Sequence, residues 1–222
     1  MKKFQQFLSQ LTAGFTPIID TKFERQDYGL IDLSINQSIN LEHKPVQKTQ
    51  AFINQFLKQT NKTIAFGGYL EQRDLYKRSP HFTNNLRDIH IGLDIWCPAN
   101  TAVISPLDAV VHSFKDNHDL GDYGPTIILQ HDFEAETFYT LYGHLSRKSL
   151  ENLQVGQPIT KASVFAEIGS AEVNGSYAPH LHFQIIRDIG DRFGDFPGVC
   201  SKAKLKHFSN NCPDPNLLLK IY

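Results

Sequence analysis

The stretch Asp88-Ile-His-Ile-Gly-Leu-Asp-Ile-Trp96 carries the alternation that decides the fold class of this chain. Every second residue is apolar, and the residues between them are Asp88, His90, Gly92 and Asp94. A period of two is typical of a β-strand with one buried and one polar face. Similar short runs, separated by Gly, Pro and Asn–Asp clusters, occupy 102–104, 110–114, 126–130, 138–142 and 181–186. They predict a mainly β fold, an antiparallel sandwich or barrel.

His90 and Asp94 are the first candidate ligands for a metal. On a flat strand they would lie about 13 Å apart, at roughly 3.3 Å per residue. Two ligand atoms of one zinc ion must approach to about 3–3.5 Å, because each metal bond is near 2.1 Å. Gly92 lies midway and is a residue type that permits a bulge or a bend. Taken alone, this pair still favours a surface His and Asp over a metal site.

A second pair of histidines lies in Ala178-Pro-His-Leu-His-Phe-Gln-Ile-Ile186. His180 and His182 share one strand face and lie about 6.6 Å apart at the backbone. Both could bind one metal, one could bind while the other points at a substrate, or both could be surface residues. The spacing does not choose among these. His144 ends the aromatic run Phe138-Tyr-Thr-Leu-Tyr-Gly-His144, and a lone histidine at a strand end is usually a surface residue.

Taken together, these elements resemble the lysostaphin/LytM-type zinc endopeptidases, which have the duplicated-hybrid-motif fold. The resemblance is carried by the following pieces in family order: His90-Ile-Gly-Leu-Asp94, Pro98-Ala-Asn-Thr-Ala-Val103, Ser105-Pro-Leu-Asp-Ala-Val-Val111, Tyr142-Gly-His144, Val155-Gly-Gln-Pro-Ile159 and His180-Leu-His182. A narrower resemblance, to a peptidase-like module of some multidomain phosphotransferase and class III aminotransferase proteins, is carried by Asp122-Tyr-Gly-Pro-Thr126, His182-Phe-Gln-Ile-Ile-Arg-Asp188 and Gly194-Asp-Phe-Pro-Gly-Val-Cys200.

The resemblance implies a site and a reaction. It implies that His90, Asp94 and His182 bind one Zn²⁺, and that His144 and His180 are catalytic histidines beside it. Three protein ligands leave one position for water, as a catalytic zinc requires. The sequence has no His-Glu-x-x-His motif, so a histidine would replace the usual glutamate base. The expected activity is hydrolysis of peptide bonds by zinc-activated water, with cell-wall-type peptides as the family's usual substrates.

The composition of the chain excludes several other classes of function. The chain has 222 residues, 41% hydrophobic and 20% charged, with ten histidines and a net charge of −1. Near-neutral charge gives no electrostatic footprint for nucleic acid. No apolar stretch has the length of a membrane span or of a signal-peptide core, so we expect a cytoplasmic protein. Cys97, Cys200 and Cys212 are odd in number and widely spaced, which disfavours a structural zinc knuckle and fits reduced thiols.

The chain divides into three expected parts. Residues 1–60 form a partly helical extension, with helical spacing at Phe4–Leu11 and Phe52–Leu57 and a polar stretch between them. Residues 61–187 form the peptidase-like β domain, and 188–222 form a loop-rich tail whose Leu217–Leu219 docks on the core. His43 or His81 could block the zinc as a fourth ligand, although lone histidines are seldom ligands.

Two hypotheses of function follow from this interpretation. The first is an active zinc peptidase acting on a peptide substrate. The second is a non-catalytic zinc-containing module that binds or regulates a separate metabolic enzyme, such as an aminotransferase or a kinase. The presence of all five site residues favours the enzyme, because degenerate relatives typically lose a ligand or a catalytic histidine.

Overall fold

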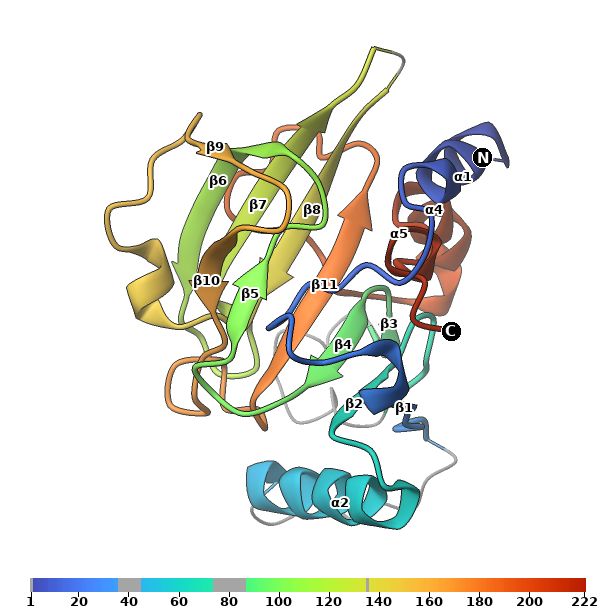
Figure 1. The fold of residues 1–222 in the computed structure, drawn as a ribbon, viewed down its shortest axis with the longest axis vertical. Helices are drawn as coiled ribbons and strands as arrows, with labels where there is room; N and C mark the ends of the chain where they lie inside the picture. Colours follow the sequence, from blue (N-terminus) through green and yellow to red (C-terminus); the bar gives the residue numbers. More distant parts are fainter. Residues whose placement is uncertain (1, 36–44, 74–86, 135) are drawn as a thin grey trace.

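The computed structural model describes residues 2–35, 45–73, 87–134 and 136–222 (Figure 1). The helices are α1 (Lys2–Gln10), α2 (Pro45–Thr60), α4 (Leu205–Asn211) and α5 (Asn216–Leu219), with 3₁₀ turns at Arg25–Asp27, Arg147–Leu150 and Lys202–Lys204. The strands are β1 (Tyr28–Leu30), β2 (Ile64–Gly67), β3 (Ile89–His90), β4 (Leu93–Trp96), β5 (Ala102–Ile104), β6 (Ala109–Asn117), β7 (Gly124–Asp132), β8 (Thr137–Gly143), β9 (Pro158–Ile159), β10 (Val164–Glu167), β11 (His180–Ile186) and β12 (Val199–Cys200).

The core of the fold is an eight-stranded sheet with the order β1-β2-β4-β11-β8-β7-β6-β9. Its neighbours pair antiparallel except β1 and β2, which are parallel. The pairs β5–β10 and β3–β12 form two small additional sheets. The predicted mainly β fold with N-terminal helices is thus confirmed, and β1 and β2 make the large sheet mixed rather than purely antiparallel.

One face of the large sheet is covered by the main hydrophobic cluster. Leu181, Phe183 and Ile185 of β11 point into it, together with Phe4 and Leu8 of α1. The cluster also contains Leu218 and Leu219 of α5, which are fully buried. Figure 1 shows α1 and α5 together beside β11, with β5 and β10 in front of the sheet. The apolar half of the β11 alternation therefore belongs to the packed core.

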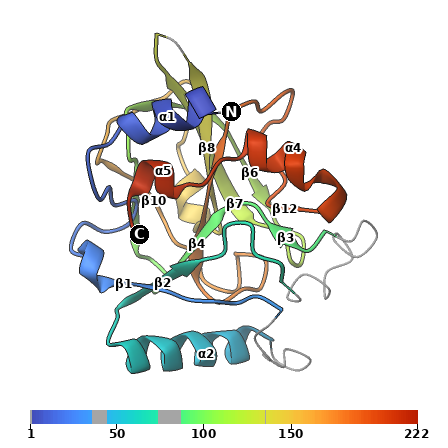
Figure 2. The same cartoon turned by 90° about the vertical axis from the view of Figure 1, so that its right-hand side faces the viewer.

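The opposite face of the sheet holds two smaller clusters. One contains Ile128, Leu141 and Ile186 and is covered by residues of β12 and α4. The other contains Ala65 and Trp96 and is covered by α2, which Figure 2 shows running alongside β1 and β2. His180 stacks on Trp96, and Gln184 pairs in register with Leu141. The polar face of β11 therefore runs from one cluster to the other.

One local prediction needs correction. The predicted single strand 89–95 is two strands, because β3 pairs with β12 and β4 pairs with β2 and β11, with Ile91 and Gly92 between them. The tail expected at 188–222 includes two short helices, α4 and α5, between its loops. The division at residues 60 and 187 stays a prediction. Within the described ranges, the helices are too short or too polar to cross a membrane.

Candidate metal centre and active site

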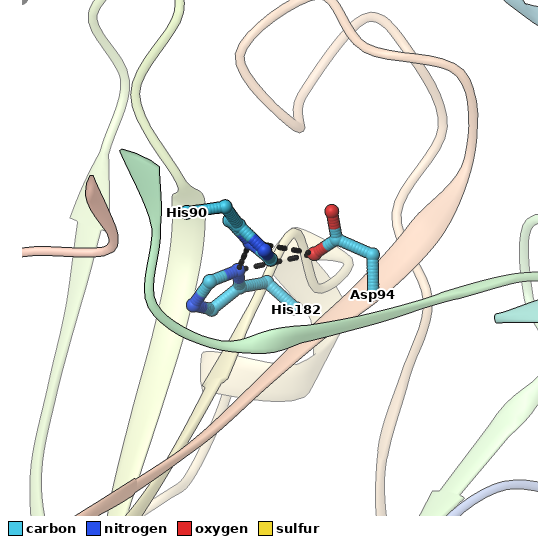
Figure 3. Close-up of side chains that lie close together, drawn as sticks. All are labelled: His90, Asp94 and His182. Atoms are coloured by element: carbon cyan, nitrogen blue, oxygen red, sulfur yellow. Dashed lines mark hydrogen bonds and ion pairs between the residues drawn. The ribbon is translucent and has the colours of Figure 1, made fainter. Parts of the chain in front are cut away.

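Three of the predicted site residues meet on the polar face of the sheet (Figure 3). Asp94 on β4 and His182 on β11 are direct partners in the antiparallel register. His90 ends β3, and the change of direction at Ile91 and Gly92 brings its ring back over this pair. The break in the predicted strand is therefore what overcomes the separation that a flat strand would impose.

Three ligand-type atoms converge at this point. His90 Nε2 lies 2.9 Å from His182 Nδ1 and 3.2 Å from Asp94 Oδ1. His182 Nδ1 lies 3.1 Å from the same carboxylate oxygen. These separations match those of atoms that share one ion with bonds of about 2.1 Å. Within the described part of the chain, this is the group of His, Cys, Asp and Glu side chains with the geometry to hold a metal.

The outer hydrogen bonds of the two imidazoles fix where their protons are. His90 Nδ1 lies 2.9 Å from the carbonyl oxygen of Gly68, which can only accept. His182 Nε2 lies 3.0 Å from Gln184 Oε1, and the Gln184 amide is oriented by donating to the Pro197 carbonyl at 3.2 Å. Each ring therefore donates outward, and both inward nitrogens carry lone pairs. Such outer hydrogen bonds are usual for histidines that bind metals.

Burial sets the charge state of this group. His90 is 1% exposed, and burial lowers the pKa of its ring to about 4. Burial alone would raise the pKa of the Asp94 carboxyl, but the adjacent His90 ring and the Arg73 guanidinium hold it well below its usual range. The site thus offers a neutral His90 imidazole and an ionised Asp94 carboxylate, which are the protonation states that metal binding needs.

Gly92 is required by the close approach of His182. A Cβ atom on Gly92 would lie 2.5 Å from Cε1 and 2.6 Å from Nε2 of the His182 ring. Distances of this kind do not occur in folded proteins, so any larger residue would push the ring away. The sequence interpretation proposed a bend at this glycine, and the structure adds steric clearance for a ligand-type side chain.

The other two predicted site residues lie beside this centre. His180 begins β11, and its Nε2 lies 3.8 Å from Asp94 Oδ1. His144 follows the last residue of β8, and its ring centroid is 4.2 Å from that of His180. The φ angle of His144 is 62°, in the left-handed region that non-glycine residues seldom adopt. Its backbone N–H donates to the Tyr123 carbonyl at 2.9 Å, and its carbonyl accepts from Gly169 at 2.8 Å, which hold this conformation.

Both of these histidines present a neutral nitrogen to the site. His144 Nδ1 donates to the Asn174 carbonyl at 2.9 Å, and His180 Nδ1 donates to the Ala178 carbonyl at 2.7 Å. Their Nε2 atoms are therefore proton acceptors. Burial and the neighbouring histidines lower the pKa of His144 well below its usual value, and burial also lowers the pKa of His180.

A cavity of about 300 Å³ opens over these residues. Its lining includes all five predicted site residues, together with aromatic side chains. Trp96 stacks on His180, with centroids 5.7 Å apart and an interplanar angle of 22°. Tyr177 contacts the His144 ring edge-on at 5.2 Å. This mixture of apolar walls and convergent polar groups is typical of small-molecule and peptide sites.

Several residues of the site were not predicted from the sequence. Arg73, Trp96 and Tyr177 had no local pattern that marked them, because their contacts are made by distant parts of the chain. Tyr123, whose hydroxyl lies 3.4 Å from His182 Nε2, stands in the Asp122-Tyr-Gly stretch that carried the narrower resemblance. Gln184 follows the two histidines on the same strand face, so the alternation itself could have indicated it.

The remaining histidines and the cysteines are separate from this centre where they are described. His131 is buried between the Asp108 carbonyl and the Thr140 hydroxyl, at 2.9 and 2.8 Å. His112 donates or accepts at Ser113, 2.8 Å away. His43 and His81, the suggested blocking ligands, lie outside the described residues. Cys97, Cys200 and Cys212 are buried free thiols, and burial raises the pKa of each.

Comparison with known families identifies a match within the chain. The model of peptidase family M23 matches residues 88–193, a range that contains His90, Asp94, His144, His180 and His182. No match to a protein of curated function was found.

Solved structures give more distant likenesses. A putative peptidase M23 from Pseudomonas aeruginosa is 19% identical, with a TM-score of 0.40 over 59% of this chain and 44% of that one. The catalytic domain of the antimicrobial peptidase lysostaphin from Staphylococcus simulans is 22% identical, with a TM-score of 0.38 over 55% of this chain and 80% of that one. A zinc-containing peptidase from Vibrio cholerae is 24% identical, with a TM-score of 0.36 over 44% and 27%. The chain thus spans less than half the length of the first and third of these proteins.

Proposed function

Because residues 88–193 match the model of peptidase family M23, we propose that this chain is a zinc-dependent peptidase of the lysostaphin/LytM kind that hydrolyses peptide bonds. His90, Asp94 and His182 would hold one Zn²⁺, and His144 and His180 would act as the catalytic histidines. The observation that carries the proposal is the convergence of three acceptor atoms, His90 Nε2, His182 Nδ1 and Asp94 Oδ1, at 2.9–3.2 Å.

The donor set fits zinc in its chemistry as well as in its distances. Two imidazole nitrogens and a carboxylate oxygen face one another at 2.9–3.2 Å, an arrangement that a cation stabilises. Two nitrogens and one oxygen suit Zn²⁺, and three protein ligands leave a position for water or substrate. When bound, zinc lowers the pKa of a water molecule towards 7 and polarises a peptide carbonyl.

The two remaining histidines supply the proton transfers of amide hydrolysis. Each is neutral with its proton on Nδ1, so Nε2 of either ring can take the proton that the attacking water loses. The same Nε2 atom can then donate that proton to the nitrogen of the departing amine. The hydrogen bonds from Nδ1 to the Asn174 and Ala178 carbonyls keep both rings oriented through the transfer. Stacking on Trp96 limits rotation of the His180 ring.

The family resemblance indicates the type of reaction more specifically than it indicates the substrate. Peptides of the bacterial cell wall are the first class to examine, because they are the usual substrates of the lysostaphin/LytM-type family that this sequence resembles. A cytoplasmic location stays a prediction, and it would direct the enzyme to wall precursors, recycled wall peptides or other amides. The alternative of a non-catalytic module is not favoured, since all five side chains line one cavity.

Peptide cleavage tests the proposal. Zinc-loaded protein is incubated with cell-wall peptides and with glycine-rich peptides, and products are identified by mass spectrometry. We expect cleavage that is lost on adding a chelator, restored by zinc and about 10²–10⁴-fold slower in His144→Ala. Stoichiometric zinc with no turnover of either class would contradict the proposed activity on these substrates.

A further inference from the structure

A short segment that precedes the matched family domain reaches the candidate metal centre. Residues 71–73 lie alongside β3: the Arg73 N–H donates to the Asp88 carbonyl at 2.8 Å, and the His90 N–H donates to the Glu71 carbonyl at 2.9 Å. Gln72 and Ile89 form an antiparallel bridge between them. The backbone of this segment is thus fixed directly to the strand that carries His90.

Arg73 is a buried cation aimed at a candidate ligand. It is 1% exposed, and its Nη1 donates to Asp94 Oδ2 at 2.5 Å. Its Nε donates to Glu71 Oε2, and Glu71 Oε1 in turn accepts the Leu33 N–H at 3.1 Å. A charged residue is seldom buried to this degree unless it is paired. The pairing here uses the carboxylate oxygen of Asp94 that does not face the two histidines.

The backbone makes room for this arginine at Gly68. A Cβ atom on Gly68 would lie 1.9 Å from Arg73 Nη2 and 2.9 Å from His90 Nδ1. The φ angle of Gly68 is 101°, which side chains disfavour, and its carbonyl accepts the His90 ring N–H. Gly68 therefore supports His90, which is one candidate ligand. It also makes room for the Arg73 guanidinium, which lies beside the candidate ligand Asp94.

Arg73 also contacts the wall of the active site. Its guanidinium carbon lies 5.6 Å from the centre of the Trp96 ring, in cation–π geometry. The other neighbour of Trp96 is His180, stacked at 5.7 Å. One side chain thus contacts a candidate metal ligand and the aromatic residue that packs on a candidate catalytic histidine.

From these contacts we propose that Arg73 is a positioning residue of the metal centre. By engaging Asp94 Oδ2, it makes Asp94 bind zinc through Oδ1 alone, so that the second oxygen does not occupy the position needed for water. The inference rests on the proposed zinc site. It assigns a function in that site to the segment before residue 88, outside the range that matches the family.

The test measures metal binding in the full chain rather than turnover alone. Zinc affinity is determined by competition with a chelator for the wild type, Arg73→Met, Arg73→Lys and the control Arg187→Met. Arg187 is a suitable control because it contacts Phe4 and Glu136 and does not line the cavity. We expect Arg73→Met to bind zinc about 10- to 100-fold more weakly, as for other residues that orient metal ligands. Arg73→Lys keeps one donor and the charge, so its affinity should be intermediate.

A spectroscopic signature separates positioning from general support of the fold. With cobalt(II) in place of zinc, release of Asp94 Oδ2 onto the metal raises the coordination number. The visible absorption of Arg73→Met should therefore be weaker than that of the wild type and of Arg187→Met. Equal zinc affinity and an unchanged cobalt spectrum in Arg73→Met would overturn the inference.

Two further outcomes are also decisive. If Arg73→Met fails to fold, Arg73→Lys decides: weaker zinc binding with an altered spectrum supports the positioning role, and wild-type values contradict it. If the wild type itself binds no zinc, the proposed function fails, and the inference about Arg73 fails with it. If the wild type binds zinc and the Arg73 variant binds it equally well with an unchanged spectrum, only the inference about Arg73 fails.

Discussion

His90 Nε2 and His182 Nδ1 lie 2.9 Å apart, although 92 residues separate them in the chain. Because each ring donates its N–H outward, to the Gly68 carbonyl and to Gln184 Oε1, the facing atoms are both lone-pair acceptors. Two acceptors this close repel unless a cation lies between them, and Asp94 Oδ1 completes the set at 3.1–3.2 Å. This relationship is the physical basis of the proposed metal centre.

The clearance at Gly92 gives a first prediction. Gly92→Ala places a methyl group 2.5 Å from the His182 ring, so the ring must move and the three ligand atoms separate. We expect loss of zinc binding and a destabilisation of about 1–3 kcal/mol, as for other overpacked cores. Metal analysis and denaturant unfolding measure the two effects.

The matched control for this prediction is Gly14→Ala. A Cβ atom on Gly14 meets nothing within 4 Å, so this variant should keep wild-type zinc content and stability. Full zinc occupancy in Gly92→Ala would show that His182 does not need its present position to bind metal.

The two histidines beside the centre give a second prediction. His144→Ala and His180→Ala should each lower kcat by about 10²–10⁴-fold, the usual contribution of a general acid or base. Both should retain zinc, because neither contributes an atom to the converging triad. Steady-state kinetics on a cleaved peptide and metal analysis of the same samples check this. A variant that loses zinc together with activity would be reassigned as a ligand.

The sequence predicted the large-scale features of this site because they depend on local pattern. The alternation of Leu181, Phe183 and Ile185 with His180, His182 and Gln184 places the two sets on opposite faces of one strand. The positions of Asp94 and His182 on paired strands, by contrast, depend on sheet register, which is set by contacts between distant segments. The resemblance to a known family, rather than strand geometry, assigned the roles of these residues.

Other features lay beyond local pattern. The break at Ile91 and Gly92 exists because β3 finds its partner in β12, more than 100 residues later. Arg73 is marked by no motif, since its buried pairing with Asp94 arises only in the folded chain. The helix α4 was missed because Leu205–Asn211 is short and contains Ser and Asn, which are poor helix formers.

A buried histidine remote from the metal centre gives a prediction of pH dependence. Burial lowers the pKa of His131 to about 4, against 6.5 for an exposed ring. The unfolded chain therefore takes up a proton below pH 6.5 that the folded chain refuses until about pH 4. The free energy of unfolding should fall as the pH decreases through this window, by about 3 kcal/mol from this residue.

The variant His131→Gln isolates this effect. An amide can still donate to the Asp108 carbonyl and accept from Thr140, but it does not titrate. Urea unfolding at several pH values between 6.5 and 4 should show a shallower loss of stability in the variant than in the wild type. Parallel curves for the two proteins would mean that His131 does not drive the acid sensitivity.

The most direct test of the metal centre is the zinc content of single variants, measured by elemental analysis after equilibration with zinc and removal of the excess. We expect one zinc ion per wild-type chain. His90→Ala, Asp94→Ala and His182→Ala should lose it, and His144→Ala and His180→Ala should keep it. If His182→Ala retains full zinc while His180→Ala loses it, the assignment within the pair of histidines on β11 is contradicted.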